Sequence, residues 1–345
     1  IKSLPDRASM PQDASAAAAV LQSLQQLGHG PGAGPAPLEA VEVADFPHGG
    51  MPVRGLRSKE LIPKSHEILI VPKPALLMDD IKHSETRFKG LSNPLGLFLA
   101  ERRKVLSEGT GNEVLDKYLR SLPSLEEARA AGVPLAASAE EVEHLKGLPR
   151  LGAIAQMVEG VRATLAKDVA RYNEVAEIGG RQPLSFEDAL WGTMIVRTRG
   201  FSCGDNDSVV APVADLVNHS YQPNARWTCT GGKTSRLSLI SKRDIQPGEE
   251  ILINYKAQSN PGAEVFLKTY GFTDGAKPEA WSRAECHRLS SAPLAGEGPL
   301  IAAARRLVAE KCGQPVVAMP AVVQMLPLLP GPPLRPGRLR LHCFL

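Results

Sequence analysis

Two stretches of this chain decide its interpretation: Val213-Ala-Asp-Leu-Val-Asn-His-Ser220 and Gly248-Glu-Glu-Ile-Leu-Ile-Asn-Tyr255. The second is rich in isoleucine and follows a Pro-Gly turn, so residues 251–255 are predicted to form a short buried strand that ends in a tyrosine. In the first, Asp215 and His219 are four residues apart and could both face a metal ion from one side of a helix. No third ligand is evident nearby, and the stretch lies among predicted strands and not in a helix, so we expect no metal.

Two further stretches flank this pair in a fixed order. Arg197-Thr-Arg-Gly-Phe201 precedes it and Leu267-Lys-Thr-Tyr-Gly-Phe272 follows it. The ordered set resembles the SET domain, and specifically the subfamily of the Rubisco large-subunit lysine methyltransferase. The stretches Leu97-Phe-Leu-Ala-Glu-Arg-Arg103 and Leu119-Arg-Ser-Leu-Pro123 are similar to others of that subfamily.

The resemblance covers residues 45–275 and implies an α+β fold. This fold has small sheets, an Asn-His segment threaded beneath a later loop, and a long helical insertion at about residues 91–198. Threading of this kind is an exception to the usual topology of protein chains. Residues 1–44 are expected to form an N-terminal extension and linker. Residues 276–345 are expected to form a short C-terminal region, loosely packed, with a proline-rich tail from Pro327.

Local signals predict the individual elements. Asn93-Pro94 and the capping boxes Ser138-x-x-Glu141 and Ser185-x-x-Asp188 mark helix starts. Gly49, Gly50 and Gly55 are expected at turns. The predicted helices cover residues 14–27, 95–106, 112–122, 138–147, 151–178, 185–199 and 299–312. The predicted strands cover residues 66–71, 208–213, 236–240 and 251–255.

Composition narrows the classes of partner. The 345 residues carry a net charge of only +3, so there is no electrostatic case for nucleic acid as a partner. No run of 18 apolar residues exists, and we expect no membrane span. The five cysteines include no C-x-x-C pair, so we expect reduced thiols and no zinc. We expect a monomer in the chloroplast or the cytoplasm, and not a secreted protein.

The resemblance implies S-adenosylmethionine as the cofactor. Arg199 can pair with the carboxylate of this methyl donor, and Asn218 offers both a hydrogen-bond donor and an acceptor. The early segment around residues 51–56 is expected to contribute backbone groups, and it lacks the G-x-G-x-x-G pattern of a dinucleotide loop. The residues that the resemblance assigns to donor binding are Arg54, Gly55, Leu56, Arg199, Asn218, His219, Tyr255 and Phe272.

Tyr255 and Tyr270 are the candidate catalytic residues, and Phe201, Asp215 and Tyr270 are expected to line the substrate channel. A lysine nucleophile must be neutral, yet its ordinary pKa is about 10.4. A dry channel beside the positive sulfur of the donor would lower that pKa. The site then needs alignment of the amine, methyl group and sulfur more than a strong base.

The expected function is methyl transfer from S-adenosylmethionine to a lysine ε-amine of a protein, such as the Rubisco large subunit or another abundant protein. Two alternatives remain: a protein-histidine methyltransferase of the same fold, and a catalytically silent binding module. Phe201 favours lysine, because a phenyl ring cannot hydrogen-bond the second nitrogen of an imidazole.

Overall fold

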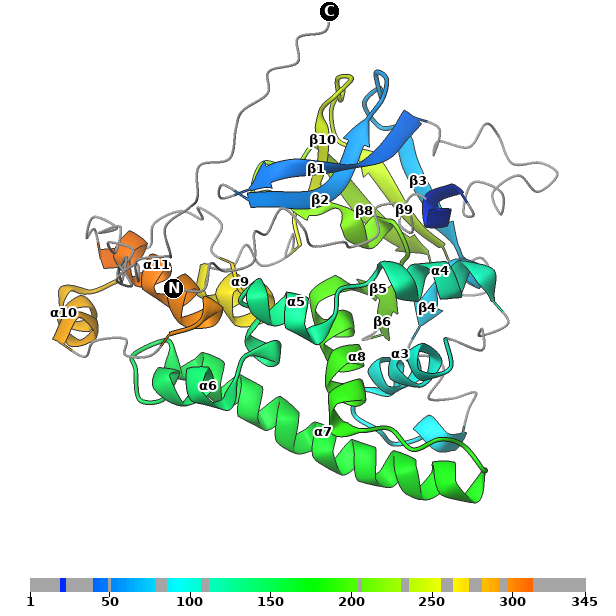
Figure 1. Cartoon of the computed structure of the whole chain (residues 1–345). Helices are drawn as coiled ribbons and strands as arrows, with labels where there is room; N and C mark the ends of the chain where they lie inside the picture. Colours follow the sequence, from blue (N-terminus) through cyan, green and yellow to red (C-terminus); the bar gives the residue numbers. More distant parts are fainter. Residues whose placement is uncertain are drawn as a thin grey trace, which may run out of the picture. The chain divides into compact units, whose positions relative to one another are not determined.

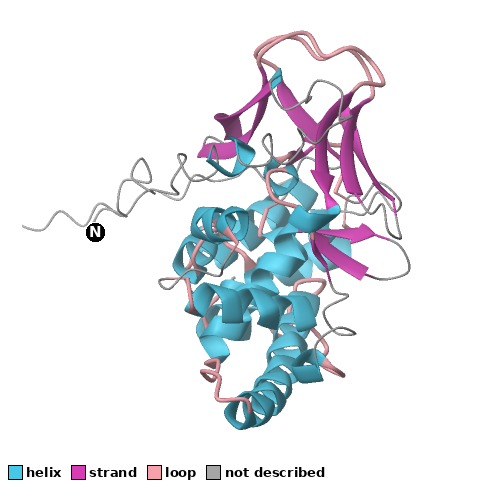
Figure 2. Cartoon of the chain, turned by 90° about the vertical axis from the view of Figure 1, so that its right-hand side faces the viewer, coloured by secondary structure: helices cyan, strands magenta, loops and turns pink. Residues whose placement is uncertain are grey.

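A computed structural model describes ten segments of the chain: residues 19–22, 40–48, 51–78, 86–106, 112–203, 207–230, 236–255, 263–272, 281–291 and 297–312. All of them belong to one compact unit, residues 10–316. Strands gather in one part of this unit and helices in another (Figure 2). No helix in these segments is long and apolar enough to cross a membrane.

The described strands form three small sheets (Figure 1). The first has the order β1-β2-β10-β7, with strands Val41–His48, Met51–Ser58, Glu250–Ile253 and Asn218–His219. The second has the order β3-β9-β8, with strands Glu67–Pro72, Arg236–Ser241 and Ala225–Thr230. The third has the order β4-β6-β5, with strands Leu77–Met78, Asp207–Val210 and Gly200–Cys203.

The four predicted strands correspond to β3, β6, β9 and β10, within a few residues at each end. Strands β1, β2, β4, β5, β7 and β8 were not predicted. The expectation of a turn at Gly55 was wrong, because Gly55 lies within β2 and is paired with Ala44 of β1. Proline, arginine and glycine interrupt the apolar alternation of β2, so pairing with β1 and β10, and not local propensity, makes it a strand.

The helical insertion comprises α3 (Pro94–Lys104), α4 (Glu113–Ser121), α5 (Leu125–Ala130), α6 (Ala139–Leu145), α7 (Gly152–Ile178) and α8 (Phe186–Arg199). The predicted starts are confirmed: Asn93 accepts a hydrogen bond from Gly96 N, and Ser138 and Ser185 form capping boxes. Helix α5 was not predicted, although Ser124 and Glu127 form a third capping box at its start.

Helix α8 packs closely against α3. This contact positions the C-terminal end of α8, where the insertion leads into β5. A Cβ at Gly192 of α8 would lie 1.9 Å from the carbonyl oxygen of Gly96 in α3, so only glycine permits this approach. Figure 1 shows α8 running from α7 toward β5 and β6. The next strand, β5, begins at Gly200, directly after the last residue of α8, Arg199.

The helices that follow β10 are α9 (Ala263–Tyr270), α10 (Arg283–Ser291) and α11 (Pro299–Cys312). The expectation of loose packing after residue 276 was wrong for α11, which buries Leu300, Ile301 and Leu307 completely. Glu141 of α6 accepts a hydrogen bond of 3.1 Å from Leu300 N and so caps this helix. The predicted helix at 299–312 is therefore part of the core. The proline-rich tail lies outside the described residues.

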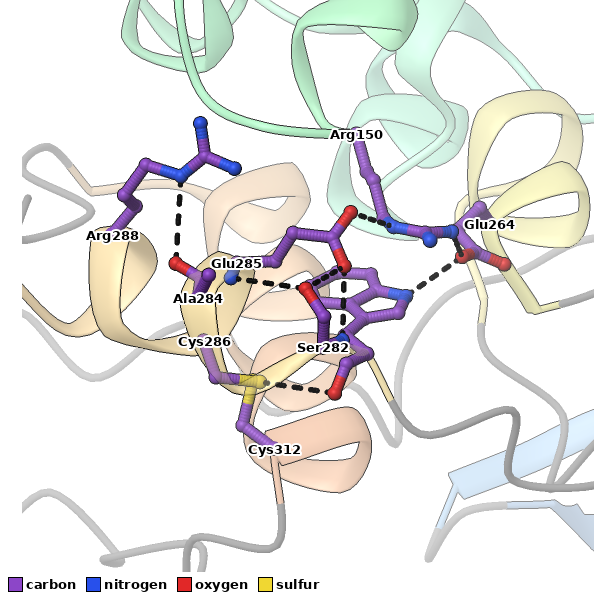
Figure 3. The surroundings of a disulfide bond; sticks show 9 residues. Arg150, Glu264, Ser282, Ala284, Glu285, Cys286, Arg288 and Cys312 are labelled. Carbon is purple, nitrogen blue, oxygen red and sulfur yellow. Dashed lines mark hydrogen bonds and ion pairs between the residues drawn. A yellow bond between two sulfur atoms is a disulfide. The ribbon is translucent and has the colours of Figure 1, made fainter.

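The expectation of reduced thiols was also wrong. The structure contains the disulfides Cys203–Cys229 and Cys286–Cys312, each with a Cα–Cα distance of 5.6 Å. The partners of each pair are 26 residues apart in sequence, and only folding brings their elements together. Cys343 lies outside the described residues. Figure 3 shows the second disulfide joining α10 to the end of α11.

An arginine from the helical insertion holds α9 and α10 together beside that disulfide (Figure 3). Arg150 donates to Glu264 of α9 at 3.1 Å and to Glu285 of α10 at 2.9 Å. Trp281 Nε1 donates to Glu264 at 2.8 Å. These bonds connect the insertion to the helix that ends in Tyr270.

The N-terminal region contributes to the core. Of the predicted helix 14–27, residues 19–22 are described and are helical, and Val20 and Leu21 are buried. Strand β1 begins at Val41, four residues before the expected start of the SET region at residue 45. The predicted linker, the glycine- and proline-rich residues 28–37, lies outside the described residues.

Candidate active site

The Asn-His segment forms the short strand β7 and is enclosed on two sides. It pairs in parallel with β10, and Ser220 N donates to Ile253 O at 2.8 Å. The ring of Phe266 from α9 lies 4.3 Å from that of His219, measured between centroids. His219 Nδ1 accepts a 3.1 Å hydrogen bond from the backbone of Tyr255. Nδ1 is therefore an acceptor, and His219 positions Tyr255 and does not serve as a base through that nitrogen.

Asn218 is held by two acceptors at its amide nitrogen. Nδ2 donates to Arg54 O at 3.1 Å and to Glu250 Oε1 at 2.8 Å. Glu250 in turn bonds Nε2 of His48 at 2.9 Å. Because an amide nitrogen has two hydrogens, both are used, and Asn218 offers its Oδ1 to a ligand as an acceptor. Neither Glu250 nor His48 was predicted as a site residue.

Gly55 fits closely against this group. A Cβ there would lie 2.8 Å from Asn218 Nδ2 and 2.9 Å from Glu250 Oε1, so any other residue would displace at least one of these two side chains. The next residue, Leu56, is fully buried. It is paired with Val43 of β1 and Ile251 of β10, so the assignment of Leu56 to donor binding stays a prediction. The segment predicted as a donor-binding loop is thus a strand whose backbone lies beside Asn218.

Arg199 and Asp215 form a buried ion pair. Arg199 Nη1 lies 3.1 Å from Asp215 Oδ2, and the side chain of Asp215 is 0% exposed. Burial raises the pKa of Asp215, and the charge of Arg199 opposes that shift. Arg199 makes its described hydrogen bonds through Nη1 alone, which leaves Nη2 and Nε for a ligand.

The turn that carries Asp215 is strained. Val213, directly before the single turn Ala214–Leu216, has φ of 70°, a conformation that β-branched residues rarely adopt. Strain of this kind is concentrated at functional sites. Asp215 Oδ1 is buried and has no hydrogen-bond partner among the described residues. A buried carboxylate oxygen without a donor suits a cationic group of a ligand.

Aromatic rings surround the end of β10. The Tyr255 and Tyr270 rings lie 5.1 Å apart, and Phe272 stacks on Tyr270 at 5.7 Å. The hydroxyl of Tyr255 donates to Val217 O at 3.0 Å. Burial raises the pKa of Tyr270 to about 12, and burial, followed by the effect of Tyr270, raises the pKa of Tyr255. Both hydroxyls are protonated at neutral pH, so they orient groups and do not remove protons.

The structure brings most of the predicted site residues together but not Phe201. The Tyr255 hydroxyl bonds the backbone oxygen of Val217, which lies between Asp215 and Asn218 in sequence, and the Tyr255 ring lies 5.1 Å from that of Tyr270, so the ion pair, the Asn218 group and the aromatic rings lie close together. Phe201 lies in β5, packs edge-on against Trp227 at 5.4 Å and is 8% exposed. It makes no ring contact with Tyr255 or Tyr270 among the described aromatic pairs, so its place in the channel stays a prediction.

The fold agrees with comparisons to known proteins. Two solved structures are similar at 22% identity: the SET domain of LSMT bound to lysine and AdoHcy, with a TM-score of 0.58, and Rubisco LSMT bound to AdoMet, with 0.56. The similarity covers 76% and 75% of this chain but only 58% and 56% of those chains. The SET domain-containing protein 8 of Schizosaccharomyces pombe (strain 972 / ATCC 24843) is 41% identical over 66 residues, 19% of this chain and 14% of that protein.

The family assignment rests on a match over more than half of the chain. The model of the SET domain family matches residues 53–256, which include most of β2, the whole helical insertion, the Asn-His strand and Tyr255. The described fold agrees with it, since small sheets surround an Asn-His strand enclosed between β10 and α9. This chain therefore belongs to the SET domain family.

Proposed function

We propose that this protein transfers a methyl group from S-adenosylmethionine to a lysine ε-amine of a protein substrate. The observation that carries the proposal is the convergence of three groups in one site: the Arg199–Asp215 ion pair, Asn218 with both amide hydrogens engaged, and the Tyr255–Tyr270 rings. The chain belongs to the SET family, and similar structures are described as bound to AdoMet, AdoHcy and lysine.

The unused polar groups fit the amino-acid end of the donor. That end carries a carboxylate and an ammonium. Nη2 and Nε of Arg199 suit the carboxylate, and Asn218 Oδ1 suits the ammonium. The glycine at position 55 keeps the backbone of β2 close to this end of the site. S-adenosylmethionine would supply the activated methyl group on its sulfonium.

The aromatic rings fit the acceptor. The Tyr255 hydroxyl, whose proton bonds Val217 O, can accept a hydrogen bond, and the protonated Tyr270 hydroxyl can accept or donate one, so both can orient an amine without taking its proton. Ring faces attract alkylated ammonium groups, which suits a lysine that gains methyl groups. Exclusion of water by Phe266 and Phe272 would favour the neutral amine that must attack the methyl group.

Mass spectrometry of proteins methylated in a lysate tests the proposal. The full chain is incubated with S-adenosylmethionine labelled in its methyl group, and labelled peptides are sequenced. Label on lysine supports the proposal, and label on histidine alone would replace it with the histidine alternative. Donor binding without any transfer would indicate a silent module. The purified Rubisco large subunit is a useful defined substrate for the same assay, because similar structures are named for it.

A further inference from the structure

A tyrosine of the helical insertion contacts the buried ion pair. Tyr118 of α4 is 2% exposed, and its hydroxyl donates to Asp215 Oδ2 at 2.9 Å. The same oxygen accepts the 3.1 Å hydrogen bond from Arg199 Nη1. Tyr118 and Asp215 are 97 residues apart in sequence, so only the docked insertion brings them together.

The hydroxyl of Tyr118 can act only as a donor to this carboxylate. Burial, followed by the charge of Asp215, raises the pKa of Tyr118 well above its ordinary value, so the hydroxyl keeps its proton. The nearby side chains Val20, Leu122 and Leu216 line the same small cavity as the three polar groups. In such dry surroundings a hydrogen bond to a carboxylate is stronger than in water.

The bond fixes which oxygen of Asp215 faces the arginine. Without the Tyr118 hydroxyl, Arg199 Nη1 would be the one remaining side-chain donor to Oδ2 in the described part of the chain, and rotation of the carboxylate would leave Nη1 with only the 3.3 Å contact to the Asp215 backbone oxygen. The other oxygen of Asp215, Oδ1, has no hydrogen-bond partner among the described residues, so the side-chain bonds that hold the carboxylate are those of Tyr118 and Arg199 to Oδ2.

We propose that Tyr118 is a positioning residue for methyl-donor binding: it orients Asp215, which holds Arg199 ready for the donor carboxylate. The inference rests on the proposed function, because it takes Arg199 as the carboxylate ligand. The inference extends that function, because a residue of the helical insertion, Tyr118, would then determine the affinity for the carboxylate end of the donor.

The test compares two ligands that differ at that end. S-adenosylhomocysteine carries the amino-acid end with its carboxylate, and 5′-methylthioadenosine lacks it. Isothermal titration calorimetry measures both dissociation constants for the wild-type chain, for Tyr118→Phe and for Tyr172→Phe. Tyr172 is a fully buried tyrosine of α7 and serves as the matched control.

Tyr118→Phe should weaken S-adenosylhomocysteine binding about tenfold, the effect of losing one hydrogen bond to a charged group. Binding of 5′-methylthioadenosine should stay within about twofold, and Tyr172→Phe should leave both affinities unchanged. Equal loss for both ligands, or no loss for either, would overturn the proposal. A wild-type chain that binds neither ligand would instead refute the proposed function, so the two failures are distinguishable.

Discussion

Replacement of Gly55 by alanine should disrupt donor binding through Asn218. The new Cβ would lie 2.8 Å from Asn218 Nδ2 and 2.9 Å from Glu250 Oε1. Ordinary contacts to a Cβ begin at 3.4 Å, so one or both groups must move by about 0.6 Å. These are the two atoms that share the 2.8 Å hydrogen bond, and a shift of this size would lengthen or break it.

The size of the effect follows from that bond. A hydrogen bond to a charged group contributes about 1.5–3 kcal/mol, which corresponds to about 10- to 150-fold in an equilibrium constant. Asn218 would then lose one of the two contacts that orient its amide, the one to a charged group, and keep the bond to Arg54 O. We expect the dissociation constant for S-adenosylhomocysteine to rise at least about tenfold in Gly55→Ala.

Calorimetry with S-adenosylhomocysteine measures this change, and thermal unfolding confirms that the variant is folded. Gly160→Ala is the matched control, because nothing lies within 4 Å of a Cβ at Gly160 in α7. That variant should gain about 0.5–1 kcal/mol of stability from better helix propensity and should bind the ligand as the wild type does. A folded Gly55→Ala variant with wild-type affinity would show that Asn218 does not bind the donor.

Three other predictions follow from named contacts. Tyr255→Phe should keep donor affinity but lose most of kcat, since only the hydroxyl bonded to Val217 O is removed. A change in KM alone would mean that Tyr255 is a binding residue. Free tyrosine has a pKa near 10, and folding raises the pKa of Tyr270 to about 12, so the unfolded state loses this proton first. Denaturant titrations should therefore show a full free energy of unfolding below about pH 10 and a decline toward pH 12, and a flat profile would contradict this. Gly192→Ala should lower the unfolding midpoint in urea markedly, because its Cβ would overlap Gly96 O; an unchanged midpoint would mean that α3 and α8 pack differently.

Much of the fold could be predicted because its signals are local. Capping residues such as Asn93, Ser138 and Ser185 mark helix starts through bonds to residues three positions later, and the structure contains each of these bonds. Short isoleucine- and leucine-rich runs predicted β3, β9 and β10 for the same reason. The ordered motifs then predicted the family, because they constrain which segments meet.

The remaining features depend on contacts between distant residues. Strand β2 contains Pro52 and Gly55 and becomes a strand only through pairing with β1 and β10. The disulfides join residues whose spacing resembles no motif. Glu250 lies within one of the motifs, yet its role could not be predicted, because its partners Asn218 and His48 are 32 and 202 residues away.

The helical insertion supplies part of the site and is not only an appendage. Arg199 is the last residue of α8 and Tyr118 belongs to α4, whereas Asn218 and Tyr255 belong to the strand region. The ion pair of Arg199 with Asp215 therefore joins the insertion to the turn just before the Asn-His strand. The close contact of Gly192 with Gly96 fixes the position of α8 against α3, and with it the position of Arg199 at the end of α8. With the proposed role of Arg199 as the ligand of the donor carboxylate, the insertion must be docked before the site can bind that end of the donor, and donor affinity should fall in variants that loosen the docking.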